Sequence, residues 1–394
     1  MTHRLFFLFW FLGTTLLIGQ TNTEVYLFDL DIQNGEPTLS NPKNISNNEG
    51  YDNQPSFWDD NTLLFSSTRA GQTDILKFNI NKGSTSSWIS DTPSGSEYSP
   101  LRIPEKNAVS AIRLDLDGLQ LLYEYDLRTG DSKPLAELKI GYHVWYNDHI
   151  LVSSVLKENR LDLVVSNLKD NTHRTLEKNV GRSLHKIPGT DLISFISKEN
   201  NIWQVKSIDP ISGDSERIAN TYNNEEDICW LNESVILTGS GKSLFMFDVE
   251  SGVAWEQVMR FEQEEINNIT RIAVNSSHTR LAFVADESPK VIVQKQLDAY
   301  NARDIDAFMD TYSDDIKLYN FPNDLISEGK DKMREQYESF FETTPDLHCQ
   351  IKNRIVIGNK VIDEEFVTIN GAQINAVAVY EVQNGKIIKV TFID

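Results

Sequence analysis

Short apolar segments, each interrupted by a polar turn, recur along the first 285 residues. Each has a strand, a tight turn and a second strand, and together they cover residues 54–67, 101–112, 143–154, 184–196, 228–237 and 269–285. The second strands centre near residues 65, 109, 152, 194, 237 and 282, a spacing of 42 to 45 residues. An internal period of this length predicts a repeated structural unit.

Most of these hairpins are followed by a third strand in which apolar and polar residues alternate, as at 74–79, 121–126 and 243–248. Turn residues come next at a fixed offset, for example at 128–131. Four short strands in each repeat are typical of a propeller blade. The pattern therefore predicts an all-β, six-bladed propeller.

The sixth repeat lacks outer strands before residue 290, whereas residues 24–29 have the outer-strand pattern without a hairpin before them. We expect the N-terminal strands to complete the last blade, because such a closure removes open sheet edges.

The spacing of apolar residues becomes helical near residue 290. Residues 293–312 predict one helix, and residues 328–342 predict a second. Strand patterns follow at 347–357, 360–370, 373–382 and 386–393, and Asn384-Gly385 is a hairpin signal between the last two. Helices followed by antiparallel strands indicate a small α+β cone domain.

The first residues indicate export. Arg4 is followed by an almost continuous apolar stretch from Leu5 to Ile18 and then by small or polar residues, which is typical of a secretory signal peptide. The alternative is a membrane anchor, although the stretch is shorter than the ~20 residues of a spanning helix. We therefore expect a signal peptide at 1–20, the propeller at 21–287, the cone domain at 288–394, and a periplasmic or secreted location.

Charge and cysteine content exclude some functions. The chain has 394 residues and a net charge of −21, and both parts are acidic, which argues against nucleic-acid binding and docking on anionic lipids. Cys229 and Cys349 are the two cysteines, and they fall in different predicted domains, so two buried thiols are favoured over a disulfide. The scattered histidines give no metal spacing. No metal site and no cofactor are predicted.

Residues 55–75 resemble the TolB/PD40 propeller repeat, with a strand ending in serines followed by Arg69, Gly71 and Asp74-Ile75. The other repeats keep the period without this signature. The resemblance implies the propeller fold and no particular partner.

The C-terminal part resembles the SnoaL-like, steroid-isomerase-like branch of the NTF2 superfamily. The matching segments are 299–308, 312–315, 319–322, 345–348, 353–358 and 380–392. Isomerases of this type need a carboxylate base and an oxyanion hole made by a tyrosine and a protonated acid. The resemblance places Asn320 at the base position, Gln296 at the tyrosine position and Ala378 or Val379 at the position of the acid, so isomerase-type proton transfer is not expected.

Polar side chains could still line a pocket in the cone. The candidates are Tyr300, Tyr312, Tyr319, Asn320, His348 and Glu364. All of these candidates except Asn320 have a structural alternative: core packing for the tyrosines, a structural histidine for His348, and a solvated outer face for the acidic run 363–365, which contains Glu364.

We therefore expect an exported binding or scaffold protein. The propeller would offer a face for a protein or glycan partner, and the cone would offer an apolar pocket for a small hydrophobic ligand or a sheet for homodimerisation. The alternative is an enzyme acting on a small hydrophobic ligand in the cone.

Overall fold

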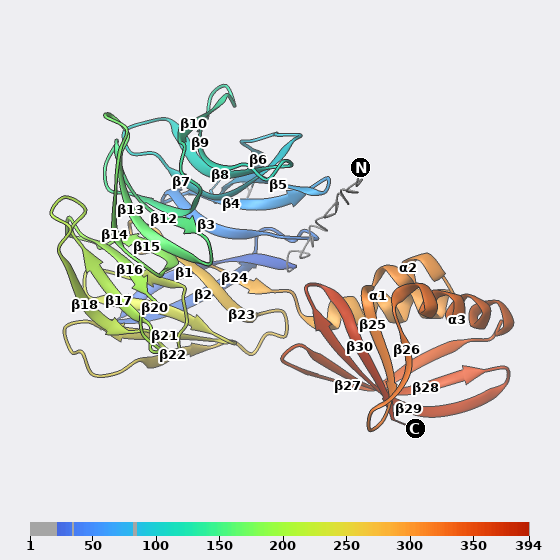
Figure 1. Cartoon of the computed structure of the whole chain (residues 1–394). Coiled ribbons are helices and arrows are strands. Elements are labelled where there is room, and N and C mark those ends of the chain that lie inside the picture. Colours follow the sequence, from blue (N-terminus) through green and yellow to red (C-terminus); the bar gives the residue numbers. More distant parts are fainter. Residues whose placement is uncertain (1–21, 34, 82–84, 394) are drawn as a thin grey trace, which may run out of the picture.

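The computed structural model describes residues 22–33, 35–81 and 85–393. Within these ranges the strands form six four-stranded sheets and one six-stranded sheet. Figure 1 shows the four-stranded sheets together as one body and the six-stranded sheet with the helices as a second body. The predicted fold class, an all-β propeller followed by an α+β cone, is confirmed. The signal peptide expected at 1–20 lies outside the described residues.

Each propeller blade is an antiparallel sheet of four strands. Blades 1 to 3 contain β3 (Asn53–Asp59), β4 (Thr62–Arg69), β5 (Gln72–Asn79), β6 (Thr85–Trp88), β7 (Gly95–Arg102), β8 (Ala108–Asp115), β9 (Gln120–Asp126), β10 (Ser132–Ala136), β11 (Ile140–Trp145), β12 (Ile150–Lys157), β13 (Arg160–Asn167) and β14 (Thr172–Glu177). Blades 4 and 5 contain β15 (Val180–Lys186), β16 (Ile193–Ser197), β17 (Gln204–Ile208), β18 (Ser215–Asn220), β19 (Ile228–Trp230), β20 (Val235–Ser240), β21 (Ser243–Asp248) and β22 (Glu256–Arg260).

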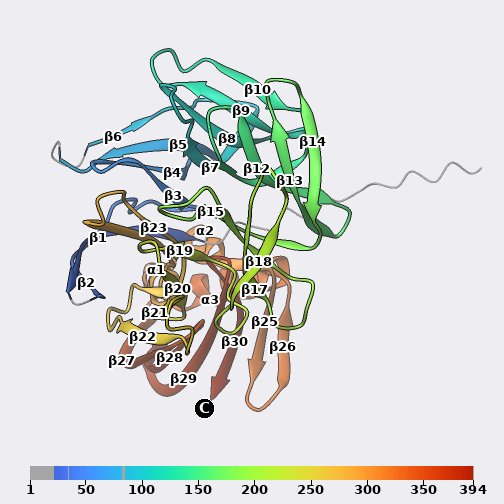
Figure 2. The same ribbon diagram turned by 90° about the vertical axis from the view of Figure 1, so that its left-hand side faces the viewer.

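Blade 6 combines both ends of the propeller sequence. Its order is β2-β1-β24-β23, from β1 (Thr23–Gln33), β2 (Glu36–Asn44), β23 (Asn267–Val274) and β24 (Arg280–Asp286). β1 pairs with β24 along its length, from Thr23 opposite Asp286 to Asp29 opposite Arg280. The first strands of neighbouring blades contact one another from β3 through β7, β11, β15, β19 and β23 back to β3, which closes the ring. Figure 2 shows the blades after a quarter turn, with blade 2 uppermost.

Two tryptophans that recur in alternate repeats pack between blades. Trp145 and Trp230 are each 6% exposed. Their indole N–H groups donate to Ser110 and Ser194 of the preceding blade, each at 2.8 Å. The repeated tryptophans therefore bury apolar surface and satisfy their one donor at the same time.

The cone domain is a mixed six-stranded sheet covered by three helices in the described part of the chain. The helices are α1 (Pro289–Ala302), α2 (Ile305–Asp310) and α3 (Lys330–Thr343). The strands are β25 (Tyr312–Asn320), β26 (Asp324–Glu328), β27 (His348–Ile357), β28 (Lys360–Ile369), β29 (Ala372–Gln383) and β30 (Lys386–Ile393). Their order is β26-β25-β30-β29-β28-β27, with β25 and β30 parallel.

The structure divides the single helix expected at 293–312. Arg303 takes a left-handed conformation at the end of α1, and the Asp304 side chain accepts a hydrogen bond from the Ala307 N–H at 3.1 Å. Such a carboxylate cap starts a new helix. The strand pair β25 and β26 was not expected, whereas the four predicted strands at 347–393 are present. The turn before β30 has positive φ at Asn384 and Gly385, as an Asn-Gly hairpin requires.

A short connection joins propeller and cone, since α1 begins three residues after the end of β24. Ion pairs from Lys290 to Glu264 at 2.7 Å and from Lys295 to Glu49 at 3.6 Å link α1 to the propeller. A hollow of about 950 Å³ lies at this junction, lined by segments of both parts. Among the described residues, no helix has the length and apolarity needed to span a bilayer.

Candidate functional site

A small cavity lies inside the cone, between α1 and the concave side of the sheet. Its volume is about 50 Å³, and its lining residues are Gln296, Leu297, Tyr300, Tyr312, Tyr337, Cys349, Glu365, Tyr380 and Phe392. A space of this size holds one or two water molecules or a small functional group. The lining is mostly aromatic, with a few polar groups.

Helix and strand periodicity bring these side chains together. Gln296 and Tyr300 are four residues apart on α1 and therefore lie on one face. On β28, Asp363 and Glu365 point to the same side of the sheet as the buried Val361 and Val367. Tyr380 lies on the neighbouring strand β29.

Glu365 is the central carboxyl group of the cavity. It is 8% exposed and accepts a hydrogen bond from the Tyr380 hydroxyl at 2.9 Å. Burial raises the pKa of Glu365 to about 7, because the charged form loses its hydration. Near neutral pH this group can therefore either donate or accept a proton.

Asp363, two residues earlier, has a different environment. Arg354 donates to both of its carboxylate oxygens, at 2.7 and 2.6 Å. Arg354 also donates to Gln294 of α1 at 2.7 Å. The Asp363 carboxylate is thus held in a buried ion pair, and Glu365 is the carboxyl that the cavity itself contains.

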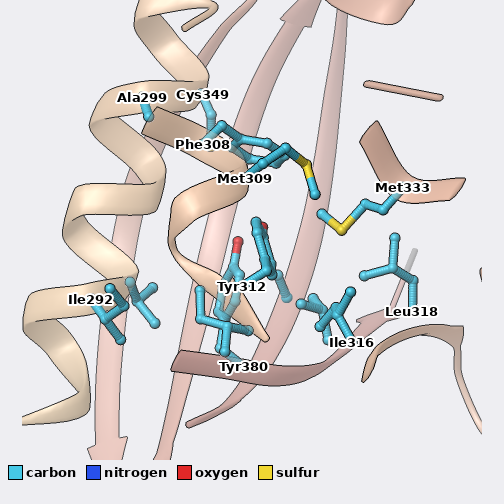
Figure 3. Close-up of a cluster of buried hydrophobic side chains, with 14 of the residues drawn as sticks. Ile292, Ala299, Phe308, Met309, Tyr312, Ile316, Leu318, Met333, Cys349 and Tyr380 are labelled. Carbon is cyan, nitrogen blue, oxygen red and sulfur yellow. The ribbon is translucent and has the colours of Figure 1, made fainter. Parts of the chain in front are cut away.

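The other polar groups of the lining are neutral. Burial raises the pKa of Tyr300, Tyr312 and Tyr337, so their hydroxyl groups keep their protons. Figure 3 shows the rings of Tyr312 and Tyr380 next to each other, with both hydroxyl groups pointing the same way. Burial also raises the pKa of the Cys349 thiol to about 12, which keeps it unreactive.

Gln296 carries an unsatisfied polar atom. The side chain is 5% exposed, and its Oε1 has no hydrogen-bond partner in the described part of the chain. Buried acceptors are rarely left in this state.

A second hollow lies on the other side of two of the lining residues. It has a volume of about 300 Å³ and is lined by Tyr300, Gln336, Tyr337 and Phe340 of α1 and α3. Tyr300 and Tyr337 belong to both linings, so these two rings separate the inner cavity from the outer hollow.

The structure brings only some of the predicted pocket residues together. Tyr300 and Tyr312 line the cavity. Tyr319 lies beneath Lys389, whose Nζ is 5.4 Å from the ring centroid, and Asn320 is exposed at the end of β25. His348 is exposed at the start of β27. Glu364 lies on the other face of β28 from Glu365, and Asn353 donates to it at 2.5 Å.

Strand alternation explains this correction. One register step along β28 moves a side chain from one face of the sheet to the other. The alternation of buried Val361 and Val367 with partly exposed residues was the signal that assigns Glu365, rather than Glu364, to the cavity. No comparable pattern indicated that Tyr337 of α3 and Tyr380 of β29 line one cavity, because this depends on how the helix packs in the folded domain.

The positions implied by the isomerase resemblance do not assemble into an isomerase site. Gln296 lines the cavity, but Asn320 is exposed and Ala378 is fully buried. Glu365 is the one carboxyl group among the cavity-lining residues. Within the described ranges, no three residues of the types His, Cys, Asp and Glu form a cluster that could hold a metal ion.

The C-terminal part of the chain is similar to known proteins. Residues 293–390 match the family described as the SnoaL-like domain. An uncharacterized cystatin-fold protein from Novosphingobium aromaticivorans is 28% identical over 27% of this chain and 97% of that protein, with a TM-score of 0.26. An NTF2-like protein of unknown function from Cytophaga hutchinsonii is 17% identical over 26% of this chain and 87% of that protein, with a TM-score of 0.24.

The propeller part is similar to TolB from Acinetobacter baumannii, at 12% identity over 64% of this chain and 66% of that protein, with a TM-score of 0.49. A search of curated proteins found no match. Residues 293–390 thus form a SnoaL-like domain, and a propeller of six four-stranded blades precedes it.

Proposed function

We propose that this protein is an exported binding protein whose cone domain takes a small ligand with an apolar body and one polar group. The polar group would reach the inner cavity, and the apolar body would occupy the outer hollow between α1 and α3. The neutral tyrosine hydroxyls and the aromatic walls support a ligand that is largely hydrophobic.

The observation that carries this proposal is the unpartnered Oε1 of Gln296 next to the Glu365–Tyr380 pair. A buried polar atom without a partner costs about 1–3 kcal/mol. A ligand hydroxyl that donates to this oxygen recovers that cost when it binds. Specificity then comes from a polar group placed within an apolar wall.

Binding is tested on the full-length chain. Native mass spectrometry detects small molecules that co-purify, and a thermal-shift titration uses 2-naphthol and cyclohexanone as probes. We expect 2-naphthol to raise the unfolding midpoint by mass action, because it can donate to Gln296 and stack between the two tyrosines. Gln296→Leu should remove the effect, whereas Glu364→Gln on the outer face should keep it. Equal responses of both variants would refute the pocket.

A second candidate function is general-base catalysis by Glu365. Its pKa of about 7 favours proton transfer at neutral pH, and tyrosine hydroxyls could stabilise a developing oxyanion. NMR can follow deuterium exchange next to the carbonyl group of cyclohexanone. Exchange that requires wild-type Glu365 and is lost in Glu365→Gln would support an enzyme, and identical slow exchange in both would refute it.

The outer face of the cone sheet supports a scaffold role as a homodimer. Ile355 and Ile357 of β27 are 53% and 64% exposed, and Ile393 of β30 is 37% exposed. Light scattering on the full-length chain should report a dimer, and Ile355→Lys should convert it to a monomer. A wild-type monomer at high concentration would exclude this interface.

Export is supported by the apolar run at 5–18, and the propeller would offer its face to a protein or glycan partner in the periplasm or outside the cell. Cell fractionation with N-terminal sequencing of the mature chain tests the location. A chain that retains its first residues in the cytosol would contradict it.

A further inference from the structure

The axis of the propeller contains a second cavity, which is independent of the cone pocket. Its volume is about 100 Å³, and every blade contributes to its lining. One residue from each blade occupies a corresponding place before or within the innermost strand, in the order Pro55, Pro100, Tyr142, Arg182, Asp227 and Arg271.

The charged members of this ring of residues all lie on one side of it. Blades 1 and 2 contribute prolines, whereas blades 4, 5 and 6 contribute an arginine, an aspartate and an arginine. Arg182 donates to both oxygens of Asp227, at 2.9 and 2.7 Å. One arginine therefore fills two of the roughly four hydrogen-bond acceptor positions of the Asp227 carboxylate.

The guanidinium of Arg271 has N–H donors that make no hydrogen bond to the described residues. Its Nη1 is 3.6 Å from Asp227, which is an ion-pair distance without a hydrogen bond. Its guanidinium lies over the ring of Tyr142, 5.1 Å from the centroid, and the side chain is 14% exposed. A guanidinium carries five N–H donors, and no hydrogen bond from these donors to another described residue is found.

The backbone aims Arg271 at the axis. The pairing of β23 with β24 shifts register between Thr270 and Ala273, and Arg271 has a φ of 50°. Bulges of this kind re-aim a side chain out of the regular alternation of a strand.

A second side chain at the same cavity has one nitrogen atom without a hydrogen-bond partner among the described residues. His143 is 5% exposed, and its Nε2 is 2.8 Å from the Ser110 hydroxyl. Its Nδ1 has no hydrogen-bond partner among the described residues. Burial lowers the pKa of His143 to about 3, so the ring is neutral.

The charges that line the cavity sum to +1, from Arg182, Arg271 and Asp227, although the whole chain carries −21. Neighbouring Glu226 is neutralised by Lys198 at 2.8 Å. A net positive, partly buried recess with a guanidinium whose N–H donors make no hydrogen bond to the described residues favours a planar anion that accepts two parallel hydrogen bonds.

We propose that the axial cavity binds a carboxylate, with Arg271 as its bidentate partner and the Pro55 and Pro100 side against the carbon chain. The volume accommodates one carboxylate group with a short apolar stem. The carboxylate can belong to a free small acid or to the C-terminus of a polypeptide, since both offer the same two oxygens.

Acetate binding to the full-length chain tests this proposal. Sodium acetate is titrated against sodium chloride at equal ionic strength, with the unfolding midpoint and saturation-transfer NMR of the acetate methyl group as readouts. Wild type is compared with Arg271→Met and with the matched control Arg217→Met, which removes the same charge from an exposed position on β18. We expect acetate to bind wild type and the control alike, and Arg271→Met about tenfold or more weakly.

Equal effects of acetate and chloride, or equal binding by Arg271→Met and wild type, would overturn the proposal. If Arg271→Met does not fold, Arg271→Lys keeps the charge and loses the planar fork. This variant should bind acetate severalfold more weakly than Arg217→Lys.

A second arm identifies the source of the carboxylate. N-acetyl-trialanine is tested as the free acid and as the C-terminal amide. Tighter binding of the free acid than of acetate assigns the site to a polypeptide end, and binding of acetate alone assigns it to a small acid. An amide that binds as tightly as the acid would contradict recognition of the carboxylate. None of these results depends on ligand binding in the cone.

Discussion

The propeller axis and the cone cavity each bury a carboxyl group, and they stabilise it in opposite ways. Asp227 is 7% exposed and Glu365 is 8% exposed. Burial works to raise the pKa of both, but Arg271 and Arg182 hold the pKa of Asp227 below its usual value. Glu365 has Tyr380 as its hydrogen-bond donor, and its pKa rises to about 7.

The difference between these two pKa values depends on the groups that contact each carboxyl group and not on the domain that contains it. Asp52 belongs to the propeller and is fully buried, yet burial raises its pKa to about 7. A cation in contact keeps a buried carboxylate charged, whereas burial without a cation in contact raises the pKa of Asp52 and of Glu365 to about 7. The propeller axis is therefore suited to hold a charge, and the cone cavity to exchange a proton or bind a neutral group.

Removing the carboxylate between two arginines should have the largest effect. Asp227→Ala leaves the half-buried Arg182 and Arg271 side chains without compensation, and we expect a loss of about 3 kcal/mol in the free energy of unfolding. Urea denaturation followed by tryptophan fluorescence measures it. Asp191→Ala is the control, because Asp191 is 86% exposed and 3.9 Å from Lys186. A loss below about 1 kcal/mol for Asp227→Ala would mean that the arginines do not need this partner.

The pH dependence of Glu365 should be the next largest effect. The unfolded chain loses this proton near pH 4.5, whereas the folded chain keeps it up to about pH 7. The contribution of Glu365 to the free energy of unfolding therefore falls by on the order of 3 kcal/mol in total as pH rises from 4.5 to 7. Above pH 7 this contribution no longer changes.

Glu365→Gln removes this ionisation and keeps a side chain that can bond to Tyr380. The difference in unfolding free energy between wild type and the variant should change across pH 4.5 to 7, in favour of the variant at the higher pH. Thermal unfolding at several pH values measures it. A difference that is independent of pH would show that Glu365 titrates as an exposed carboxyl does.

Much of the fold could be predicted from the sequence, because the repeat in the propeller and the spacing of apolar residues in the cone are both visible in short segments of the chain. The repeat of about 43 residues located the hairpins, and the Asn384-Gly385 turn located the last strand pair. The break at Asp304 was missed because apolar spacing continues across it, although the capping residue was visible. The β25–β26 hairpin was missed because its turn contains Pro322 and because no strand pattern was recognised on either side of that turn.

The sites were harder to predict. Alternation along β28 could have chosen Glu365 over Glu364, but the meeting of Gln296, Tyr337 and Tyr380 depends on how helices pack on the sheet. Arg182, Asp227 and Arg271 lie about 45 residues apart, so the repeat would have aligned them. The residue at this place differs in charge from one repeat to the next. A comparison that looks only for residues shared by the repeats therefore does not find this cluster.

A smaller effect is expected from the hydroxyl group of Tyr380. Tyr380→Phe removes its hydrogen bond to Glu365, which costs about 1 kcal/mol. That bond lowers the pKa of Glu365, so its loss should move the pH-dependent window further upward. Unfolding curves at pH 5 and pH 8 separate the two consequences. An unchanged window would mean that burial alone sets the pKa.

The smallest effects should come from the predicted pocket residues that lie outside the cavity. His348 is exposed, and Glu364 lies on the opposite face of β28 from Glu365. Substitutions His348→Ala and Glu364→Gln should each change the free energy of unfolding by less than about 0.5 kcal/mol. Neither should alter binding of 2-naphthol or the pH dependence that Glu365 causes. Because Glu364 and Glu365 differ by one register step, a large effect of Glu364→Gln would reverse the assignment of the two faces and place the working carboxyl group on the outer side of the sheet.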